Sequence, residues 1–258
     1  MKKHDLFSII EEICPSSLAE GWDNSGVQIN TSVDDVGVIL VSLDITDEVI
    51  DEARSLRADL IITHHPLLFT PLKKIDTNSP VGRYIQKLIL NGTSVYSCHT
   101  SFDRMNGGNN DEIGRLLEIE DVRSFNDDKI MGRRGELSND MRLGGLIAYI
   151  SEKLQIDIAK IKGVGDPDRF LRSIAWCSGA GADYIEKIAE MGLDVFVTGD
   201  VKYHDAMVAK ERGLVLIDCG HYGTEKSFAA NMTRMLNAKL SESGVCAICS
   251  EIDTDPFV

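Results

Sequence analysis

Long apolar runs are absent from this sequence. Nowhere do about 18 apolar residues follow one another, the minimum for most membrane-spanning helices, so we predict that the chain does not cross a membrane. Residues 1–17 lack the pattern of a secretory signal, because Glu11 and Glu12 interrupt the apolar stretch after Lys2 and Lys3. We expect an amphipathic helix there and a cytoplasmic protein.

Basic side chains are fewer than acidic ones. The 258 residues include 27 Lys and Arg against 41 Asp and Glu, which gives a formal net charge of −14. An acidic surface has no general attraction for a phosphate backbone. Nucleic acid is therefore not an expected partner, although a local basic patch would change that expectation.

Cysteine is sparse and scattered. Of the six cysteines, only Cys246 and Cys249 have the C-x-x-C spacing of a zinc-binding pair, and no second pair completes a thiolate zinc site. The alternation in residues 245–249 (VCAIC) is typical of a buried strand. We therefore predict reduced thiols in the protein core.

Short apolar runs that alternate with helical patterns are what the sequence does contain. Its 43% hydrophobic and 26% charged residues are typical of a globular protein with one large domain or two moderate ones. Strands are predicted at 36–44, 59–65 and 93–100. The helices between them begin after an N-cap at Thr46 and end at Gly92. This order is typical of an α/β fold with a parallel sheet.

The same pattern returns in the second half of the chain. Residues 58–65 (ADLIITHH) align with residues 193–200 (LDVFVTGD), and residues 91–103 align with residues 212–225. Similarity of this kind indicates a diverged internal duplication.

The duplication predicts two similar α/β lobes. We place the first at residues 1–125 and the second at residues 126–258, with a junction around 122–130. The segment 121–172 is charged and contains glycine, and a helix is expected near 143–155. The C-terminal part of the second lobe could pack back on the first.

Four of the six histidines follow predicted strand ends. His64 and His65 end one strand, His99 follows another, and His221 follows a strand of the second copy. The carboxyl ends of parallel strands meet at one edge of a sheet, where ligands bind in α/β proteins. One such histidine could be an ordinary core residue, but four at equivalent ends favour a functional site.

Carboxylates at helical spacing accompany these histidines. Asp103 follows His99 by four residues, and Glu225 follows His221 by four. Imidazole and carboxylate together suit zinc, iron, manganese or nickel. Neighbouring strand residues point to opposite sides, so adjacent histidines at a strand end fit two nearby ions better than one. Two such ions commonly hold a hydroxide for hydrolysis.

Five longer motifs occur in order and span most of the chain. They are WDNSGVQ (22–28), THHPLLF (63–69), HTSFDRMNGGNNDEIG (99–114), TGDVKYHDA (198–206) and GHYGTE (220–225). Any one of them is a weak signal, whereas five in this order are specific. Together they resemble the NGG-interacting-factor-three-like family, whose members are also catalogued as GTP cyclohydrolase 1 type 2 homologues.

The resemblance implies a dinuclear metal site with five ligands and Glu225 as the bridging residue. The implied ligands are His64, His65, Asp103, His221 and Glu225. It also implies that the site lies in the cleft between the two lobes and that the protein forms a toroidal homohexamer. The short connection between the halves leaves no room for the inserted domain that some members carry.

Other residues are candidates for supporting roles. Asp44 ends the first strand and could orient a ligand histidine. His99 has ligand spacing, but the family pattern places the ligand elsewhere, so we expect it to support a ligand or act as an acid or base. Lys202 and His204 could contact an anionic substrate or hold the lobes together. Residues 178–183 (SGAGAD) could bind a substrate anion.

Two hypotheses for the function follow. The first is a metal-dependent hydrolase, cyclohydrolase-like, that uses two divalent ions on a nucleotide or a related small molecule. The second is a non-catalytic metal-binding or adaptor protein that works through a ring-shaped oligomer. The predicted ligands are the same in both cases. A ring that threads DNA gains nothing from a net charge of −14.

Overall fold

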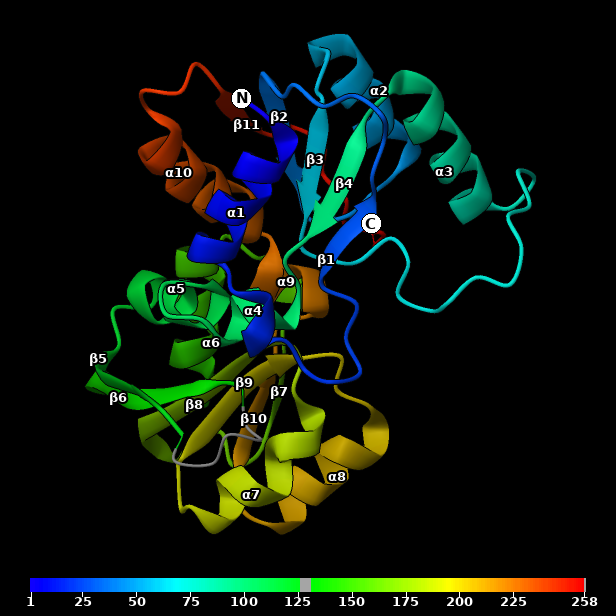
Figure 1. The fold of residues 1–258 in the computed structure, drawn as a ribbon. Coiled ribbons are helices and arrows are strands. Elements are labelled where there is room, and N and C mark those ends of the chain that lie inside the picture. Colours follow the sequence, from blue (N-terminus) through cyan, green and yellow to red (C-terminus); the bar gives the residue numbers. More distant parts are fainter. Residues whose placement is uncertain (126–130, 258) are drawn as a thin grey trace. The chain divides into compact units, whose positions relative to one another are not determined.

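The chain folds into two compact units, each built on one β-sheet (Figure 1). The computed structural model describes residues 1–125 and 131–257. The first unit contains Met1–Met105 and Phe228–Val258, and the second contains Asn106–Ser227. The prediction of an α/β fold is therefore confirmed.

The C-terminal segment belongs to the first unit. Strand β11 (Cys246–Cys249) pairs in parallel with β2 (Val38–Ser42), which returns the chain to the first sheet. The lobe boundary predicted at 125/126 adjoins residues 126–130, which lie outside the described residues, and it stays a prediction.

The first sheet has the strand order β1-β4-β3-β2-β11. Its other strands are β1 (Gly26–Ile29), β3 (Leu60–Thr63) and β4 (Ser94–Ser97). Strands β2, β3 and β4 run parallel to one another, as predicted. Strand β11 joins them in parallel beside β2, whereas β1 pairs antiparallel with β4. The sheet is therefore mixed, and β1 was not predicted.

Helices cover both faces of this sheet (Figure 1). Figure 1 shows α2 (Asp47–Leu56) and α3 (Pro80–Asn91) on one side, and α1 (Lys3–Ile13) and α10 (Phe228–Leu240) on the other. The predicted caps are confirmed: Thr46 Oγ1 accepts from the Val49 N–H at 3.2 Å, and Gly92 ends α3 with a φ of +73°. The short helices η1 (Ser16–Leu18) and α4 (Thr100–Arg104) complete the unit.

The second sheet has the order β5-β6-β8-β9-β10-β7. Its strands are β5 (Glu120–Ser124), β6 (Arg133–Arg142), β7 (Lys162–Val164), β8 (Phe170–Ala180), β9 (Val195–Gly199) and β10 (Val215–Asp218). Its helices are α5 (Asn109–Leu116), α6 (Leu143–Leu154), η2 (Ile158–Lys160), η3 (Ala182–Tyr184), α7 (Ile185–Glu190), α8 (Tyr203–Glu211) and α9 (His221–Glu225). Only β8, β9 and β10 form the predicted parallel core.

The segment 121–172 is more structured than the sequence predicts. Helix α6 confirms the helix expected near 143–155, but β5, β6 and β7 were missed. All of β5 is exposed, and seven of the ten residues of β6 have polar side chains. These antiparallel strands therefore lack the continuous apolar run that identifies a strand buried on both faces.

Both faces of the second sheet are buried. Along β9, Val195 and Val197 pack in one apolar cluster with α5 and α6, while Phe196 packs in another with α7 and α8. Successive strand residues point to opposite faces, so this arrangement explains why the strand reads as an uninterrupted apolar run.

The prediction for the cysteines is correct in part. All six are free, and four of them are buried: Cys14, Cys98, Cys177 and Cys219. Burial, followed by the nearby charge of Asp218, raises the pKa of Cys219 to about 12. The strand expected at 245–249 is confirmed as β11, but it is buried only in part, because it lies at the sheet edge, with Cys246 exposed and Cys249 half-buried. Within the described residues, no helix has the length and apolar character needed to cross a membrane.

An ion-pair cluster ties α2 to α3. Asp47, in the first turn of α2, accepts hydrogen bonds from Arg83 at 2.7 Å and from Lys87 at 2.6 Å. These two cations lower the pKa of Asp47 from 3.8 to about 2. The carboxylate is only partly buried, so the expected stabilisation is modest.

We expect Asp47→Asn to lower the free energy of unfolding by about 0.5 kcal/mol near pH 7, as for other exposed ion pairs. Because the pKa is lowered on folding, this stabilisation is present above about pH 4 and is lost as the pH falls towards 2. Urea unfolding followed by circular dichroism at several pH values measures it. Asp51→Asn is the control, since Asp51 pairs with Arg54 of its own helix. Equal losses in the two variants would contradict the prediction.

Candidate metal centre

Three histidines gather at the carboxyl edge of the first sheet. Strand β3 ends at Thr63, directly before His64 and His65, and β4 ends at Ser97, two residues before His99. One ring nitrogen from each histidine lies within 4.8 Å of the others. The chain leaves the strand geometry at Thr63, so both adjacent histidines can contribute to one group.

The Nδ1 atoms of His64 and His65 are both held by oxygen atoms. His64 Nδ1 lies 2.8 Å from the carbonyl oxygen of Cys98, and His65 Nδ1 lies 2.7 Å from Asp44 Oδ1. A carbonyl or a carboxylate accepts but does not donate, so Nδ1 carries the proton in each neutral ring. The lone pair is then on Nε2, which is the tautomer that metal-binding histidines adopt when an outer acceptor orients them.

Asp23 holds the third histidine in the same way. Its Oδ1 lies 2.7 Å from His99 Nδ1, and its side chain is fully buried. Burial alone would raise the pKa of Asp23, but hydrogen bonds from His99, Thr100 and Ser25 outweigh it and hold that pKa well below its usual range. Asp23 is therefore ionised at neutral pH. The sequence indicated this residue only as part of the motif at 22–28.

Asp103 lies next to this histidine group. It is buried in α4, directly after β4, and its Oδ2 is 3.6 Å from His64 Nε2. Two neighbouring ligands of one ion, each bound at about 2.1 Å, lie about 3.0 to 3.4 Å apart. A small side-chain movement would therefore let both atoms bind the same ion.

The second unit offers a separate pair of ligand types. Helix α9 is little more than one turn long, so His221 and Glu225 share a face, with Nε2 and Oε2 3.1 Å apart. His221 Nδ1 lies 2.8 Å from Asp200 Oδ2, at the end of β9. His221 thus repeats the pattern of an Nδ1 atom held by an oxygen.

Gly179 keeps the space beside this pair open. It has a φ of +63°, and a Cβ built on it would lie 2.3 Å from Glu225 Oε1 and 3.3 Å from His221 Nε2. The Gly179 N–H donates to Thr224 Oγ1 at 2.9 Å. This N–H is therefore used within the unit, which argues against the anion-binding role considered for residues 178–183.

The donor set in each unit fits a divalent transition metal. Both sets combine imidazole nitrogen with carboxylate oxygen, which suits zinc, iron, manganese or nickel. Asp103 and Glu225 are buried, with side chains only 6% and 3% exposed. A buried carboxylate needs a compensating charge or hydrogen bonds, and a metal ion supplies the charge. These groups therefore support metal binding.

His204 has a different environment. It lies exposed on α8, where its ring contacts that of Tyr203 at 5.3 Å between centroids. It does not belong to any group of candidate metal ligands found within residues 1–125 and 131–257. Contact of His204 with a substrate stays a prediction, and so does contact of Lys202 with a substrate. The backbone N–H of Lys202 donates to Asp205 Oδ2.

Substituting Gly179 tests the open space beside Glu225. We expect Gly179→Ala to weaken zinc binding by at least about tenfold, because the new methyl group displaces a carboxylate that the metal needs. Competition with a chromophoric chelator measures the affinity. Gly192→Ala is a matched control, since Gly192 also has a positive φ, of +71°, but a Cβ there meets no atom within 4 Å. Equal losses would assign the effect to backbone strain.

Removing the acceptor of His65 tests the orientation argument. We expect Asp44→Ala to weaken zinc binding by about 10- to 100-fold, the usual effect of losing an outer partner of a ligand histidine. The chelator competition reports the change. Asp51→Ala, another exposed carboxylate of the first unit, should leave the affinity unchanged. A change of less than twofold in Asp44→Ala would contradict the prediction.

Comparison with known proteins gives consistent matches over the whole chain. The family described as Duf34/NIF3 (NGG1p interacting factor 3) matches residues 1–256. A protein from Clostridium perfringens named GTP cyclohydrolase 1 type 2 homolog is 35% identical over 262 residues, covering 100% of this chain and 99% of that protein. NIF3-like protein 1 from Drosophila melanogaster is 27% identical and covers 96% of this chain and 86% of its own.

A solved structure agrees with these sequences. The crystal structure of a Bacillus cereus protein related to NIF3 superposes with a TM-score of 0.92 at 25% identity, covering 100% of this chain and 99% of the other. The match to the family extends over nearly all the residues that form the two sheets and carry the candidate ligands. The chain therefore belongs to the Duf34/NIF3 family.

Proposed function

We propose that this protein binds two divalent metal ions per chain and is a metal-dependent hydrolase of a nucleotide or a related small molecule. The proposed ligands are His64, His65, Asp103, His221 and Glu225. The observation that carries the proposal is the contact common to four histidines, in which each Nδ1 lies within 2.8 Å of an oxygen. A histidine in a protein core can be satisfied by a hydrogen bond at either ring nitrogen. In a metal site, each ligand histidine needs an outer partner at one ring nitrogen so that the other faces the ion.

The two units are proposed to descend from an internal duplication. Equivalent backbone contacts support this proposal: the Cys98 N–H donates to the Thr63 carbonyl at 2.8 Å, and the Cys219 N–H donates to the Thr198 carbonyl at 2.8 Å. Both contacts lie where a parallel strand pair ends, just before the segment that carries candidate ligands. A duplication explains why each unit offers histidine and carboxylate at that position.

His99 is the proposed acid–base residue. Bound metal ions would lower the pKa of a water molecule and stabilise negative charge. The ionised Asp23 holds the proton on His99 Nδ1 and stabilises the imidazolium formed when Nε2 accepts a second proton. His99 can therefore take a proton at Nε2 and return it to a leaving group.

The proposed substrate is a nucleotide or a related small molecule. The relatives' name, GTP cyclohydrolase 1 type 2 homolog, favours a nucleotide, and attack of water on a purine ring carbon is compatible with the donor set. A toroidal homohexamer and a cytoplasmic location remain part of the proposal on the strength of the family resemblance.

The first test is the metal content of untagged protein purified without added metal. Two transition-metal ions per chain are expected, and His64→Ala and Glu225→Ala should lose them because each removes a ligand. Elemental analysis by mass spectrometry gives the stoichiometry. His99→Ala should retain metal but lose turnover in a nucleotide screen, and His204→Ala should retain both.

Wild-type protein that holds no metal and takes up none of zinc, iron, manganese or nickel would contradict the proposal. Full metal content without turnover, together with tight binding of a macromolecule, would instead favour the adaptor hypothesis. The two results are distinguishable because metal content tests the proposed ligands, whereas turnover tests the proposed reaction.

A further inference from the structure

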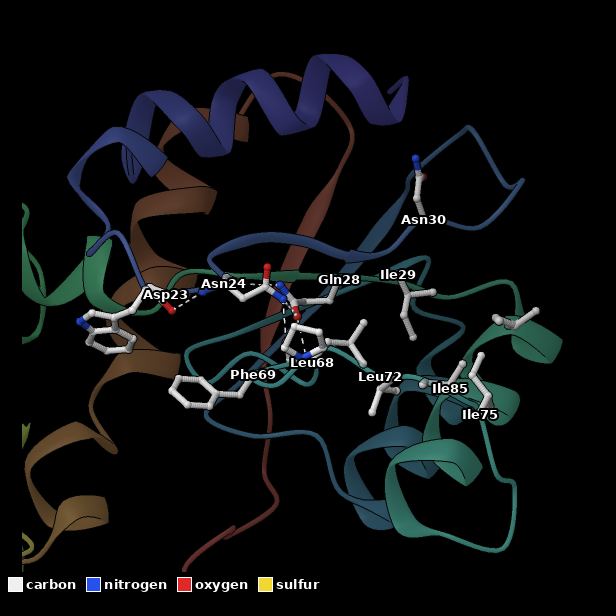
Figure 2. Close-up of a pocket in the computed structure, with 13 residues that line it drawn as sticks. Asp23, Asn24, Gln28, Ile29, Asn30, Leu68, Phe69, Leu72, Ile75 and Ile85 are labelled. Atoms are coloured by element: carbon white, nitrogen blue, oxygen red, sulfur yellow. Dashed lines mark hydrogen bonds between the residues drawn. The ribbon is translucent and has the colours of Figure 1, made fainter.

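A pocket of about 740 Å³ opens in the first unit. Figure 2 shows its lining residues, among them Asp23, which holds His99 of the histidine group. This volume is within the range of pockets that hold small molecules. Its buried side includes Ile29 and Ile85, while Trp22, Phe69 and Ile75 line it as exposed side chains. The pocket is therefore concave and largely apolar.

Two aromatic rings connect this pocket to the candidate metal centre. Trp22 and Phe69 contact each other edge to face, with centroids 6.0 Å apart, and both contact the His99 ring, at 6.2 and 6.1 Å. The two side chains are nevertheless 60% and 54% exposed. Large rings that are held in place but left open to solvent are characteristic of surfaces that receive another ring.

The polar part of the pocket wall is fixed by hydrogen bonds within the protein. Gln28 Oε1 accepts from the Leu68 N–H at 3.1 Å, and Gln28 Nε2 donates to the Asn24 carbonyl at 2.6 Å. Asn24 Nδ2 donates to the Leu68 carbonyl at 2.7 Å. These contacts, drawn in Figure 2, join residues 24–28, which include the start of β1, to the loop after β3. The pocket is therefore formed before any ligand arrives.

This wall also limits which ligands fit. The side-chain amides of Asn24 and Gln28 are used within the protein, and Asp23 holds His99. Apart from Asn30, the other lining residues are apolar, among them Leu72 and Ile89, which are 47% and 55% exposed. A strongly polar ring would lose its hydration here without gaining equivalent hydrogen bonds. A flat ring of low polarity loses little.

We propose that this pocket binds a flat aromatic ring of low polarity, which positions the polar end of the substrate at His99. The role in positioning a substrate rests on the proposed function, and within it favours a related small molecule with a ring of low polarity over a nucleotide, whose base is strongly polar. Ring binding itself requires no metal. The proposal assigns Trp22 and Phe69 as residues that determine substrate specificity.

Labelling with 5-fluorotryptophan provides a direct readout. The chain has two tryptophans: Trp22 lines the pocket, and Trp176 is fully buried in the second unit, so it serves as an internal reference. We would titrate 2-naphthol into the full-length protein and follow both ¹⁹F resonances, assigned with Trp22→Phe. The Trp22 resonance should shift saturably while the Trp176 resonance stays in place.

Matched ligands and variants define the site. Decahydro-2-naphthol, which has the same carbon skeleton but is not flat, should bind at least tenfold more weakly. Phe69→Ala should weaken 2-naphthol binding at least tenfold. Leu90→Ala should leave it within twofold, because Leu90 is 79% exposed on α3 but does not line the pocket.

Several results would overturn the inference. These are a shift of both tryptophan resonances, equal effects of Phe69→Ala and Leu90→Ala, or no saturable shift. If gel filtration then shows that Phe69→Ala changes the oligomeric state, a second copy of the chain covers the pocket instead. Repeating the titration after metal removal separates the two proposals. If the protein binds the ring but never holds metal, the pocket proposal is supported and the metal proposal is contradicted. If it binds metal but not the ring, only the pocket proposal is contradicted.

Discussion

The hydrogen bond from a histidine Nδ1 atom to a fixed oxygen is the contact on which the candidate metal centre depends. It sets the tautomer and the direction of the ring together. For His64 the acceptor is a backbone carbonyl, so the orientation follows from the main chain itself. For His65, His99 and His221 the acceptor is a carboxylate. A buried hydrogen bond to a charged group, such as that to Asp23, contributes about 1.5 to 3 kcal/mol, and one to a more exposed carboxylate, such as Asp44 or Asp200, contributes less. A ring without such an acceptor would rotate, and its Nε2 atom would lose its fixed direction.

Parallel strand pairing places these contacts. In the first sheet, β2, β3 and β4 end at the same edge, so Asp44, His65 and His99 come close although they lie far apart in the sequence. The second sheet repeats the geometry with Asp200 after β9 and His221 after β10. Each unit thus supplies candidate ligands through the same topological rule, in which side chains beyond the strands' carboxyl ends are available for chemistry.

The segment 22–28 links the candidate centre to the pocket. Asp23 holds His99, while Asn24 and Gln28 fix the pocket wall through contacts with Leu68. Trp22 lies between the two features and contacts the His99 ring. This one short segment therefore holds both the orientation of a candidate acid–base residue and the shape of the surface beside it.

Elements with local signals could be predicted from the amino-acid order alone: the apolar runs of β3 and β9, the N-cap at Thr46 and the helix end at Gly92. The histidines and carboxylates could be predicted as well, because their spacing after strands is visible in the chain. The contact of Asp23 with His99, 76 residues away, and the room that Gly179 leaves for Glu225 arise from the packing of the folded chain. The polar strands β5 and β6 likewise acquire their structure from partners. Contacts between distant residues leave no periodic pattern, since they depend on how separate elements pack.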